Sequence, residues 1–555
     1  MMIDTLERWY EWYPKNVSRE LPVPKRTLAE AWSMRVSETP EATALRYFDA
    51  EYTAREVDTA ASAIAVGLRR LGVRRGDVVG IQLQNVPQFV LVELALWQLG
   101  AVALVLNPMY KQRELATIVA DARPVGLVGA EGEIEAAASM LGDLFSGWVL
   151  TTREYDASAR DSRMPDELGR PVAGDLPQTD LHTLLARHQG ETPGQVELSP
   201  DAPALLTYTS GTTGEPKGAV ASHANLLATA ESTRQWLDLR PGERVLAIAP
   251  LFHITGAVAV AVTSLVSGAE LVFIGRLTPE RFLQAVVDYR IQHLCGSITA
   301  YNSLLDLPAG NADSFQSLRT VFSGGAPVPP QTVARFQARF GHYIRNIYGM
   351  TETASACIAV PLGHEAPVEP STGTLAIGVP MPGVRVRVRG SEGSVAAPGV
   401  QGELEISGPS VTREYLNKPD ATAETIVDGW LRTGDVAILD TAGWVYLVDR
   451  MKDQINVSGY KVWPREVEDV LYEHRAVREA AVVGRPHPYS GEEVVAYVSL
   501  RTGGVATSEE IRAYVKARLA AYKAPKTVVI LSDLPKTATG KIQRRALRDP
   551  STDLQ

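Results

Sequence analysis

The stretch YTSGTTGEPKG, Tyr208–Gly218, combines glycines, small hydroxyl side chains and one lysine. It follows the apolar run PALL, and a helical pattern, HANLLATAESTRQWL, comes after it. Glycines let backbone N–H groups approach an anion closely, hydroxyl groups add donors, and a lysine adds a positive charge. In open α/β sheets, ligands bind where a strand ends in such a loop. The stretch therefore predicts a phosphate-binding loop at the end of a strand.

Strand-like and helix-like runs alternate through the large front part of the chain. Val78–Leu83 is a short apolar run, and Val86–Ala101 has the spacing of a helix. Further short apolar runs end at Gly, Pro or Ser, namely RVLAIAPL, ELVFIG, HLCGSI and TVFSGGA. This alternation predicts the α/β class, with buried and mostly parallel strands. We expect two βαβ-type subdomains, and a loop-heavy insertion over residues 131–200.

The pattern of apolar and polar residues changes near residue 380. VRVRVRG, Val384–Gly390, alternates with a period of two, and further strand-like runs punctuated by Gly and Pro follow it. This pattern predicts a small, barrel-like antiparallel subdomain. After Asp449, the helical pattern VEDVLYEHRAV, the strand-like EEVVAYVSL and the helical SEEIRAYVKARLAAY predict a small α+β domain. We place the boundary at Asp449–Asp453, so that the domains span residues 1–449 and 450–555.

Composition limits the classes of function. The chain has 555 residues, of which 45% are hydrophobic and 21% charged, and its formal net charge is −9. An acidic balance argues against a nucleic-acid partner. Cys295 and Cys357 are far apart and lack the spacing of zinc ligands. The N-terminus has no signal-peptide pattern, so we expect a cytoplasmic protein.

Residues 245–269 contain no Lys, Arg, Asp or Glu, and this length would cross a bilayer. Pro250, His253 and two glycines interrupt the stretch. We interpret it as a core strand followed by a buried helix, and we expect no transmembrane segment. Peripheral membrane contact remains an alternative.

Several nucleotide and hydrolase signatures are absent from the sequence. The loop does not fit G-x-x-x-x-G-K-[ST], and no G-x-G, G-x-S-x-G or H-E-x-x-H occurs. The order T-S-G-T-T-G-x-P-K-G instead resembles the phosphate-binding signature of the adenylate-forming superfamily, which contains acyl-CoA synthetases, peptide-synthetase adenylation domains and beetle luciferases. Seven further stretches resemble motifs of this superfamily in the same order, and they are Ala249–Gly256, Ser323–Pro329, Asn346–Ser355, Gly402–Thr422, Gly429–Ala437, Val448–Glu468 and Pro535–Arg545.

The resemblance implies a two-step reaction. A carboxylate attacks ATP to give an acyl-AMP and pyrophosphate, and a thiol then displaces AMP. The first step brings an anion to a polyanion, so that positioning and charge neutralisation are its main requirements. ATP, Mg²⁺ and coenzyme A are the implied substrates and cofactor.

The resemblance also implies roles for individual residues. Lys217 would act with the glycine loop on the β- and γ-phosphates, Thr351 would reach the α-phosphate, and Glu352 would hold Mg²⁺. Tyr348 would stack on the adenine, and Asp435 would bind the ribose with Arg450 nearby. The implied phosphate loop comprises Thr209, Ser210, Gly211, Thr212, Thr213, Gly214 and Lys217. The implied adenine slot comprises Gly324, Gly325, Ala326, Asn346, Tyr348, Gly349 and Met350.

Lys541 is implied to be the catalytic lysine of the small, mobile C-terminal domain. It would contact the carboxylate and the α-phosphate during adenylation, a role suited to a flexible point charge. Lys452 matches the hinge position of the superfamily, where the small domain rotates between the two steps. Rotation would withdraw Lys541 and bring Gly459 and Tyr460 to the thiol channel.

The acid and the acceptor are less closely defined. Peptide-synthetase domains place an aspartate after the phenylalanine of the APLF motif, whereas His253 follows Phe252 here. This disfavours an amino acid, and His253 resembles the gate beside the acyl pocket of CoA ligases. The remaining candidate wall of this pocket includes Cys295, Gly296, Ser297, Thr299, Ala300, Tyr301 and Cys357. We expect a medium- or long-chain fatty acid. An aryl or cinnamate-type acid is the alternative, and a carrier protein or an amine is the alternative acceptor. We expect a monomer or a homodimer.

Overall fold

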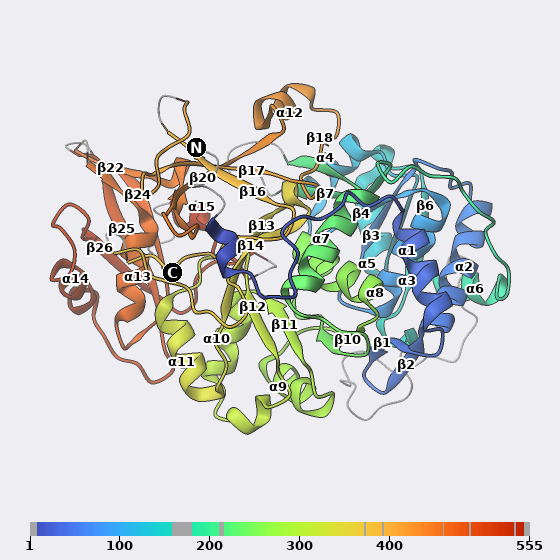
Figure 1. Ribbon diagram of the computed structural model, residues 1–555, viewed down its shortest axis with the longest axis horizontal. Helices are drawn as coiled ribbons and strands as arrows, with labels where there is room; N and C mark the ends of the chain where they lie inside the picture. The colour runs from blue at the N-terminus through green and yellow to red at the C-terminus, as the bar shows by residue number, and fades with distance from the viewer. Residues whose placement is uncertain are drawn as a thin grey trace.

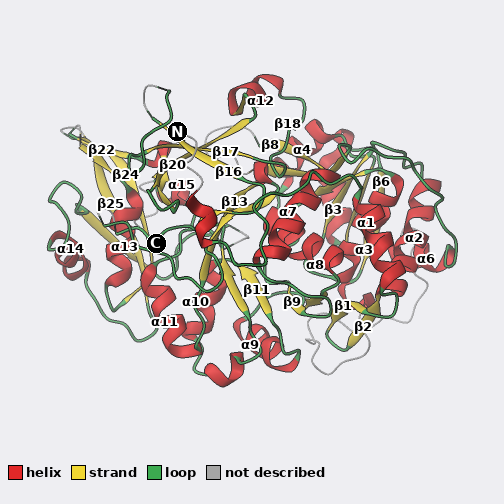
Figure 2. Cartoon of the chain, viewed as in Figure 1, coloured by secondary structure: helices red, strands yellow, loops and turns green. Residues whose placement is uncertain are grey.

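The computed structural model describes residues 8–157, 180–209, 216–370, 373–390, 393–458, 460–487, 490–537 and 540–548. Its large domain lies on the right in Figure 1, and the small C-terminal domain, coloured orange to red, lies on the left. Helices and strands alternate throughout the large domain (Figure 2). The predicted α/β class, with a small α+β domain at the C-terminus, is confirmed.

The sheet that carries the glycine loop has the strand order β18-β8-β7-β4-β3-β5-β6. The strands from β7 to β6 pair in parallel, and β8 and β18 add antiparallel strands at one edge. Their bounds are β3 Val78–Gln82, β4 Val102–Val105, β5 Gly126–Ala130, β6 Trp148–Thr152, β7 Pro203–Thr209, β8 Lys217–Ser222 and β18 Glu414–Tyr415. The helices of this part are α2 Ala54–Arg70, α3 Pro87–Leu99, α4 Gln112–Ala122, α5 Glu133–Leu141 and α6 Leu181–Arg187.

A second sheet has the order β15-β14-β13-β12-β11-β9-β10-β1-β2. Its strands from β1 to β13 are parallel, and β2, β14 and β15 are antiparallel additions. The strands are β1 Thr43–Tyr47, β2 Ala50–Thr53, β9 Arg244–Leu246, β10 Glu270–Phe273, β11 His293–Gly296, β12 Thr320–Ser323, β13 Arg345–Met350, β14 Ser355–Ala359 and β15 Val379–Pro380. The helices are α1 Leu28–Glu38, α7 His223–Trp236, α8 Thr263–Ser267, α9 Pro279–Asp288, α10 Ile298–Asp306 and α11 Pro330–Phe340.

The uncharged stretch 245–269 forms two elements, as predicted. β9 supplies the strand, and the π-helix Thr255–Val262 continues into α8. These helical turns are buried against α7 and β14 because nearly every residue is apolar. Within the described residues, no helix combines the length and the apolar character that are needed to cross a membrane.

The third sheet confirms the predicted antiparallel subdomain. It is built from β16 Arg385–Arg389, β17 Gly402–Ser407, β19 Ile426–Val427, β20 Trp430–Leu439 and β21 Val445–Arg450, and α12 Pro419–Thr425 lies beside it. Alternate residues of β16 are buried, whereas Arg387 pairs with Glu405 of β17 at 2.6 Å. The period-two pattern therefore divides the strand into a core face and a charged face.

The small domain is an α+β unit with its own cores. Its strands are β22 Ile455–Val457, β23 Tyr460–Val462, β24 Val477–His487, β25 Gly491–Leu500 and β26 Thr527–Leu531. Its helices are α13 Pro464–Glu473, α14 Ser508–Lys516 and α15 Arg544–Leu547. The buried cluster of the large domain extends to Val448, and the clusters of the small domain begin at Ile455.

The prediction of a loop-heavy insertion over residues 131–200 is wrong in part. α5 and β6 lie within this range because Ile134, Ala137 and Leu141 have helical spacing, and because Leu150 is buried in an edge strand. α6 follows Asp180, whose side chain caps its first turn. Residues 158–179 lie outside the described residues.

Residues near the N-terminus form an aromatic segment, defined here as Trp9, Tyr10, Trp12 and Tyr13. The Trp12 ring lies 5.3 Å from that of Trp444, and its Nε1 donates to the carbonyl of Ala442 at 2.8 Å. The hydroxyl of Tyr13 donates to the carbonyl of Pro380 at 2.6 Å. The segment therefore joins the second and third sheets.

Candidate active site

The predicted site residues lie at the carboxyl ends of strands in both α/β sheets. Thr209 ends β7, Gly324 and Gly325 follow β12, and Tyr348 lies near the end of β13. β20 and β21 of the third sheet supply Asp435 and Arg450. This is the edge at which α/β sheets bind ligands.

The glycine loop connects two antiparallel strands. Thr209 of β7 is paired in register with Lys217 of β8, so the two ends of the loop lie opposite each other in the sheet. The sequence pattern did not reveal β8, because KGAVAS is short and precedes the helix directly. The predicted loop residues Ser210, Gly211, Thr212, Thr213 and Gly214 lie outside the described residues.

The predicted adenine slot is lined by closely packed backbone. A Cβ atom on Gly324 would lie 2.3 Å from the carbonyl oxygen of Ile347, and one on Gly349 would lie 1.8 Å from that of Ser355. Gly325 adopts φ +77°, a conformation that favours glycine. Asn346 is buried on β13, Ala326 is partly buried, and the Met350 amide donates to Thr353 Oγ1 at 2.9 Å. Larger side chains at these glycines would displace the strand edges.

The backbone is also constrained directly after Thr351 and Glu352. Ala354 adopts φ +48° and Ser355 φ +99°, values that non-glycine residues rarely adopt. Such conformations cluster at functional sites, where the surrounding structure maintains them. Here the short helix Thr351–Thr353 and β14 hold the turn that presents Glu352.

Tyr348, Asp435 and Arg450 form one hydrogen-bonded group. The hydroxyl of Tyr348 donates to Asp435 Oδ2 at 2.6 Å, and Arg450 Nε lies 3.2 Å from Asp435 Oδ1. Asp435 and Arg450 face each other in the register of β20 and β21. Burial raises the pKa of Asp435, and the positive charge of Arg450 opposes this shift. The carboxylate is therefore fixed in place by one donor and one cation.

Lys541 of the small domain lies beside this group. Its side chain is accessible to solvent, yet protein atoms of both domains surround it. This desolvation, reinforced by the charge of Arg450, lowers the pKa of Lys541 to about 8. The adjacent Gly540 is bound to the large domain, because Thr299 Oγ1 donates to its carbonyl at 2.8 Å.

His253 follows β9 and lies close enough to Lys541 to be affected by its charge. Burial, reinforced by the positive charge of Lys541, lowers the pKa of His253 to about 4. Nδ1 accepts a hydrogen bond from the Thr255 amide at 3.3 Å. The imidazole is therefore neutral near pH 7, and its Nε2 carries the proton.

Glu352 is buried and forms a second polar group with Tyr415 and Lys217. The hydroxyl of Tyr415 donates to Glu352 Oε1 at 2.6 Å, and Lys217 Nζ lies 5.0 Å from the centre of the Tyr415 ring. Burial raises the pKa of Glu352, and the charges of Arg450 and Lys217 oppose that rise. An oriented carboxylate of this kind fits a divalent cation that would be shared with substrate phosphates. Among the described residues, no three His, Cys, Asp or Glu side chains gather into a metal site.

The residues predicted for the second step lie elsewhere. Lys452 is exposed in the short helix Met451–Asp453. The ring of Tyr460 is exposed and stacks on Tyr522 of the small domain, with centroids 4.8 Å apart. Gly459 lies outside the described residues. The structure thus groups Lys541 with Asp435 and Arg450, two of the predicted nucleotide-binding residues, and it does not bring Tyr460 to them.

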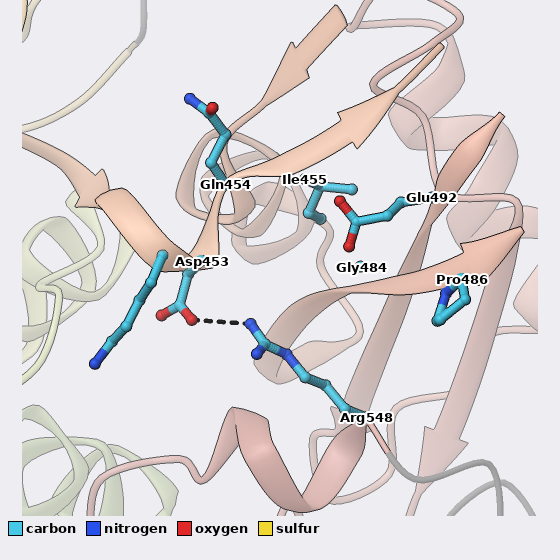
Figure 3. Close-up of a pocket in the computed structure, with 8 residues that line it drawn as sticks. Asp453, Gln454, Ile455, Gly484, Pro486, Glu492 and Arg548 are labelled. Atoms are coloured by element: carbon cyan, nitrogen blue, oxygen red, sulfur yellow. Dashed lines mark hydrogen bonds and ion pairs between the residues drawn. The ribbon is translucent and has the colours of Figure 1, made fainter. Parts of the chain in front are cut away.

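A cavity of about 360 Å³ lies beside Lys452, the predicted hinge residue (Figure 3). Its walls come from Lys452–Ile455, Gly484, Pro486, Glu492 and Arg548. In Figure 3 the guanidinium of Arg548 points at Asp453, which it contacts at 2.9 Å. Of the predicted site residues, Lys452 lines this cavity. The cavity therefore belongs to the surroundings of the predicted hinge, and its walls do not include Asp435 or Lys541.

Two residues of the site were missed from the sequence. Tyr415 lies within a stretch that resembles the superfamily, but a single tyrosine there gave no sign that it would meet Glu352. Thr299 was expected only as part of the acyl-pocket wall, and its contact with Gly540 depends on how the domains pack. No local pattern encodes either contact.

Comparisons with known proteins agree with this geometry. The model of the AMP-binding enzyme family matches residues 32–416, and that of the AMP-binding enzyme C-terminal domain matches residues 466–541. A long-chain-fatty-acid–CoA ligase of Bacillus subtilis (strain 168) is 33% identical over 98% of both chains. A feruloyl-CoA synthase of an Amycolatopsis species is 34% identical over 93% of this chain and 98% of its own.

Solved structures show the same arrangement. ATP-bound MatB from Rhodopseudomonas palustris superposes with a TM-score of 0.83 at 26% identity, covering 95% of this chain and 99% of its own. An anthranilate CoA ligase in complex with anthranoyl-AMP gives a TM-score of 0.84 at 25% identity, covering 96% and 98%. The chain therefore belongs to the AMP-binding enzyme family, and it is an adenylate-forming acid–thiol ligase that uses ATP and coenzyme A.

Proposed function

We propose that the enzyme activates a medium- or long-chain fatty acid. A carboxylate oxygen attacks the α-phosphorus of ATP and displaces pyrophosphate, which gives the acyl-AMP. The thiol of coenzyme A then attacks the acyl carbon, loses its proton and displaces AMP. The observation that supports this reaction is the position of Lys541, which lies beside Asp435, Arg450 and His253 although it belongs to the other domain.

We assign the nucleotide to the groups described above. Tyr348 and the glycine-lined slot would hold the adenine, and Asp435 with Arg450 would hold the ribose. Thr209, Lys217 and the loop between them would hold the phosphates, and Thr351 would reach the α-phosphate. Glu352 would hold Mg²⁺, which would neutralise charge on the phosphates when bound.

Lys541 would neutralise charge where the two anions meet. A carboxylate approaching a phosphate is repelled, and a cation between them lowers this repulsion most in the transition state. His253, neutral and beside Lys541, would line the entrance for the acid. The pKa of Lys541, at about 8, keeps most of this side chain protonated near pH 7.

The substrate class rests on two observations. His253 occupies the position after Phe252 and offers no carboxylate to an amino group, which argues against amino acids. Long-chain-fatty-acid–CoA ligases of Bacillus subtilis and Escherichia coli O157:H7 are 33% and 30% identical, each over 98% of this chain. An aromatic acid is the second candidate, because the feruloyl-CoA synthase is 34% identical.

We further propose that the two domains, residues 1–449 and 450–555, rotate about Lys452 between the two steps. The separation of the hydrophobic cores between Val448 and Ile455 supports this boundary. Rotation would move Lys541 out and carry Gly459 and Tyr460 towards the thiol. We place the enzyme in the cytoplasm as a monomer or a homodimer, with peripheral membrane contact as an option for a lipid substrate.

The test is an incubation of the purified protein with Mg²⁺, ATP, coenzyme A and a panel of acids, read by mass spectrometry. The panel contains short to long aliphatic acids, benzoates, cinnamates and amino acids. We expect acyl-CoA from aliphatic acids of one range of chain lengths. Cinnamoyl- or benzoyl-CoA as the main product would establish the second candidate. Acyl-AMP without acyl-CoA would overturn the assignment of coenzyme A as the acceptor.

A further inference from the structure

The loop that carries Lys541 is fixed within the small domain. The Thr537 amide donates to the carbonyl of Lys541 at 2.7 Å, and the Lys541 amide donates to Thr537 Oγ1 at 3.1 Å. Lys536 and Ile542 pair as an isolated bridge at the base of the loop. These contacts join the two ends of the loop, but they do not set the distance between Lys541 and the proposed nucleotide site.

Arg544, three residues after Lys541, contacts carboxylates from three separate segments. Its guanidinium lies 3.1 Å from Asp449 at the end of β21, 3.4 Å from Asp453 and 2.7 Å from Glu468 of α13. Asp449 and Glu468 are buried, with exposed side-chain fractions of 4% and 8%. Arg544 is therefore the cation at the centre of a nearly buried acidic cluster.

The contact with Asp449 crosses the proposed hinge. Asp449 precedes Lys452, whereas Arg544 and Glu468 follow it. Asp449 Oδ2 also accepts the Arg465 amide at 2.9 Å, and the Arg465 guanidinium donates to the carbonyl of Leu447 at 2.6 Å. A rotation at Lys452 has to change these contacts, because they join residues on opposite sides of the pivot.

The charges of the cluster depend on one another. Burial raises the pKa of Glu468, and the charge of Arg544 opposes this rise. The carboxylates in turn raise the pKa of Arg544, against the effect of its own burial. Removing one member of a buried ion pair leaves an uncompensated charge, which is strongly unfavourable. The arrangement with Lys541 in the site is thus the one in which this cluster is complete.

We propose that Arg544 is a positioning residue for acyl-AMP formation, and that it holds Lys541 in the site by bridging Asp449 on one side of the hinge to Glu468 on the other. Lys541 contacts the substrates, and Arg544 acts through it. This inference rests on the proposed role of Lys541. It also implies that the bridge to Asp449 opens before the thioester forms.

The test measures the two half-reactions separately in Arg544→Gln and Asp449→Asn. Adenylation is followed by acid-dependent exchange of labelled pyrophosphate into ATP, and thioester formation is followed from supplied acyl-AMP and coenzyme A. We expect adenylation to fall by at least about tenfold in both variants, while thioester formation stays within about twofold of the wild type. Arg544→Lys should recover part of the adenylation activity, because lysine keeps the positive charge but lacks the planar guanidinium group that contacts several carboxylates at once.

Arg548→Gln is the matched control. Arg548 follows α15 directly, and the side chain also pairs with Asp453 but is 43% exposed. Neither half-reaction should change by more than about twofold in this variant, because exposed pairs contribute little.

An equal loss of both half-reactions, or no loss of either, would overturn the proposal for Arg544. If Arg544→Gln fails to fold, Asp449→Asn decides alone, because an asparagine keeps an oxygen for the Arg465 amide. Lys541→Ala serves as the reference. If that variant does not separate the half-reactions, the proposed role of Lys541 fails. If it does and the Arg544 and Asp449 variants do not follow it, only the present inference fails.

Discussion

At the scale of single residues, the site places ionisable side chains where burial and neighbouring charges change their chemistry. Asp435 is held by Tyr348 and Arg450, and Lys541 comes to the same place from the other domain. Burial lowers the pKa of Lys541, and the nearby charge of Arg450 lowers it as well. Burial, reinforced by the charge of Lys541, keeps His253 neutral.

Substituting Lys541 with alanine should separate the two half-reactions. We expect acyl-AMP formation to fall by about 10²–10³-fold, because one preorganised charge in the transition state is lost. Thioester formation from supplied acyl-AMP should stay within about twofold of the wild type. Arg545→Ala, at an exposed position of α15, is the control and should retain both activities. Similar losses in both half-reactions of Lys541→Ala would contradict the assignment.

The pH dependence of adenylation should report the same lysine. Lys541 is active when protonated, so kcat/KM for adenylation should decline as pH rises through about 8. Arg450 and Arg544 lower the pKa of Lys541, and Asp435 and Asp453 raise it. Thioester formation from supplied acyl-AMP should not show this decline as pH rises through about 8. A flat adenylation profile up to about pH 10, near the ordinary pKa of lysine, would show that the lysine is not perturbed.

Tyr415→Phe should weaken the use of Mg²⁺. The hydroxyl of Tyr415 fixes Glu352, and partners of this kind typically change metal affinity by about tenfold or more when they are lost. We expect the Mg²⁺ concentration for half-maximal adenylation to rise by about tenfold, with a smaller effect at saturating Mg²⁺. Tyr446→Phe, which removes a hydroxyl bonded to Asp440, is the control. An unchanged Mg²⁺ titration would remove Glu352 from the metal site.

At the scale of elements, α3 contains a buried carboxyl group in a mostly apolar helix. Glu93 is 0% exposed, and within the described residues neither carboxylate oxygen has a hydrogen-bond partner. Burial raises the pKa of Glu93 well above its ordinary value. A buried carboxyl without a partner destabilises the folded state.

Glu93→Leu should therefore stabilise the large domain, by about 1–3 kcal/mol at neutral pH. The folded-state pKa of Glu93 is raised, so ionisation above the unfolded value of about 4.3 favours unfolding. The gain in stability of Glu93→Leu over the wild type should be smallest near pH 4 and should grow as pH rises. Thermal melting at several pH values measures it, with Glu38→Leu at an exposed position of α1 as the control. A lower melting temperature in Glu93→Leu would indicate that the carboxyl has a structural role.

At the scale of the whole molecule, the chain joins three sheets and a small domain through contacts between distant residues. The aromatic segment near the N-terminus is one such connection, because it reaches the carbonyls of Ala442 and Pro380. Arg544 is another, because it joins three segments around the proposed hinge. Both connections determine how the sheets and the small domain are positioned relative to one another.

Trp12→Ala should test the aromatic segment. The indole packs against Trp444 and His364 and donates one hydrogen bond. We expect a loss of about 2–4 kcal/mol in stability, seen as a lower melting temperature, with adenylation at low temperature nearly unchanged. Val23→Ala, at a side chain 62% exposed, should have little effect. An unaltered melting temperature in Trp12→Ala would mean that the aromatic segment does not stabilise the contact between the second and third sheets.

The sequence predicts the elements better than their arrangement. Apolar runs that end at Gly, Pro or Ser become the parallel strands, and VRVRVRG becomes β16, because these patterns follow from local periodicity. The order of strands in two separate sheets and the edge strand β8 depend on pairing between distant segments. The motif residues Asp435, Glu352 and Lys541 were identified by resemblance. The contacts of Tyr415 and of the carboxylates around Arg544 could not be predicted from the sequence, because their partners are far away in the chain.

The hydrogen bond from Thr299 to Gly540 joins the proposed acid pocket to the loop that carries Lys541. Thr299 lies in the first turn of α10, the helix that we propose as a wall of the acid pocket, and Gly540 is adjacent to Lys541. Any redesign of this enzyme for a new acid that replaces Thr299 would also loosen the catalytic loop. Engineered variants with altered chain-length preference at this position should therefore be slow with every acid. Libraries aimed at selectivity should vary the far wall of the pocket and leave α10 intact at its first turn.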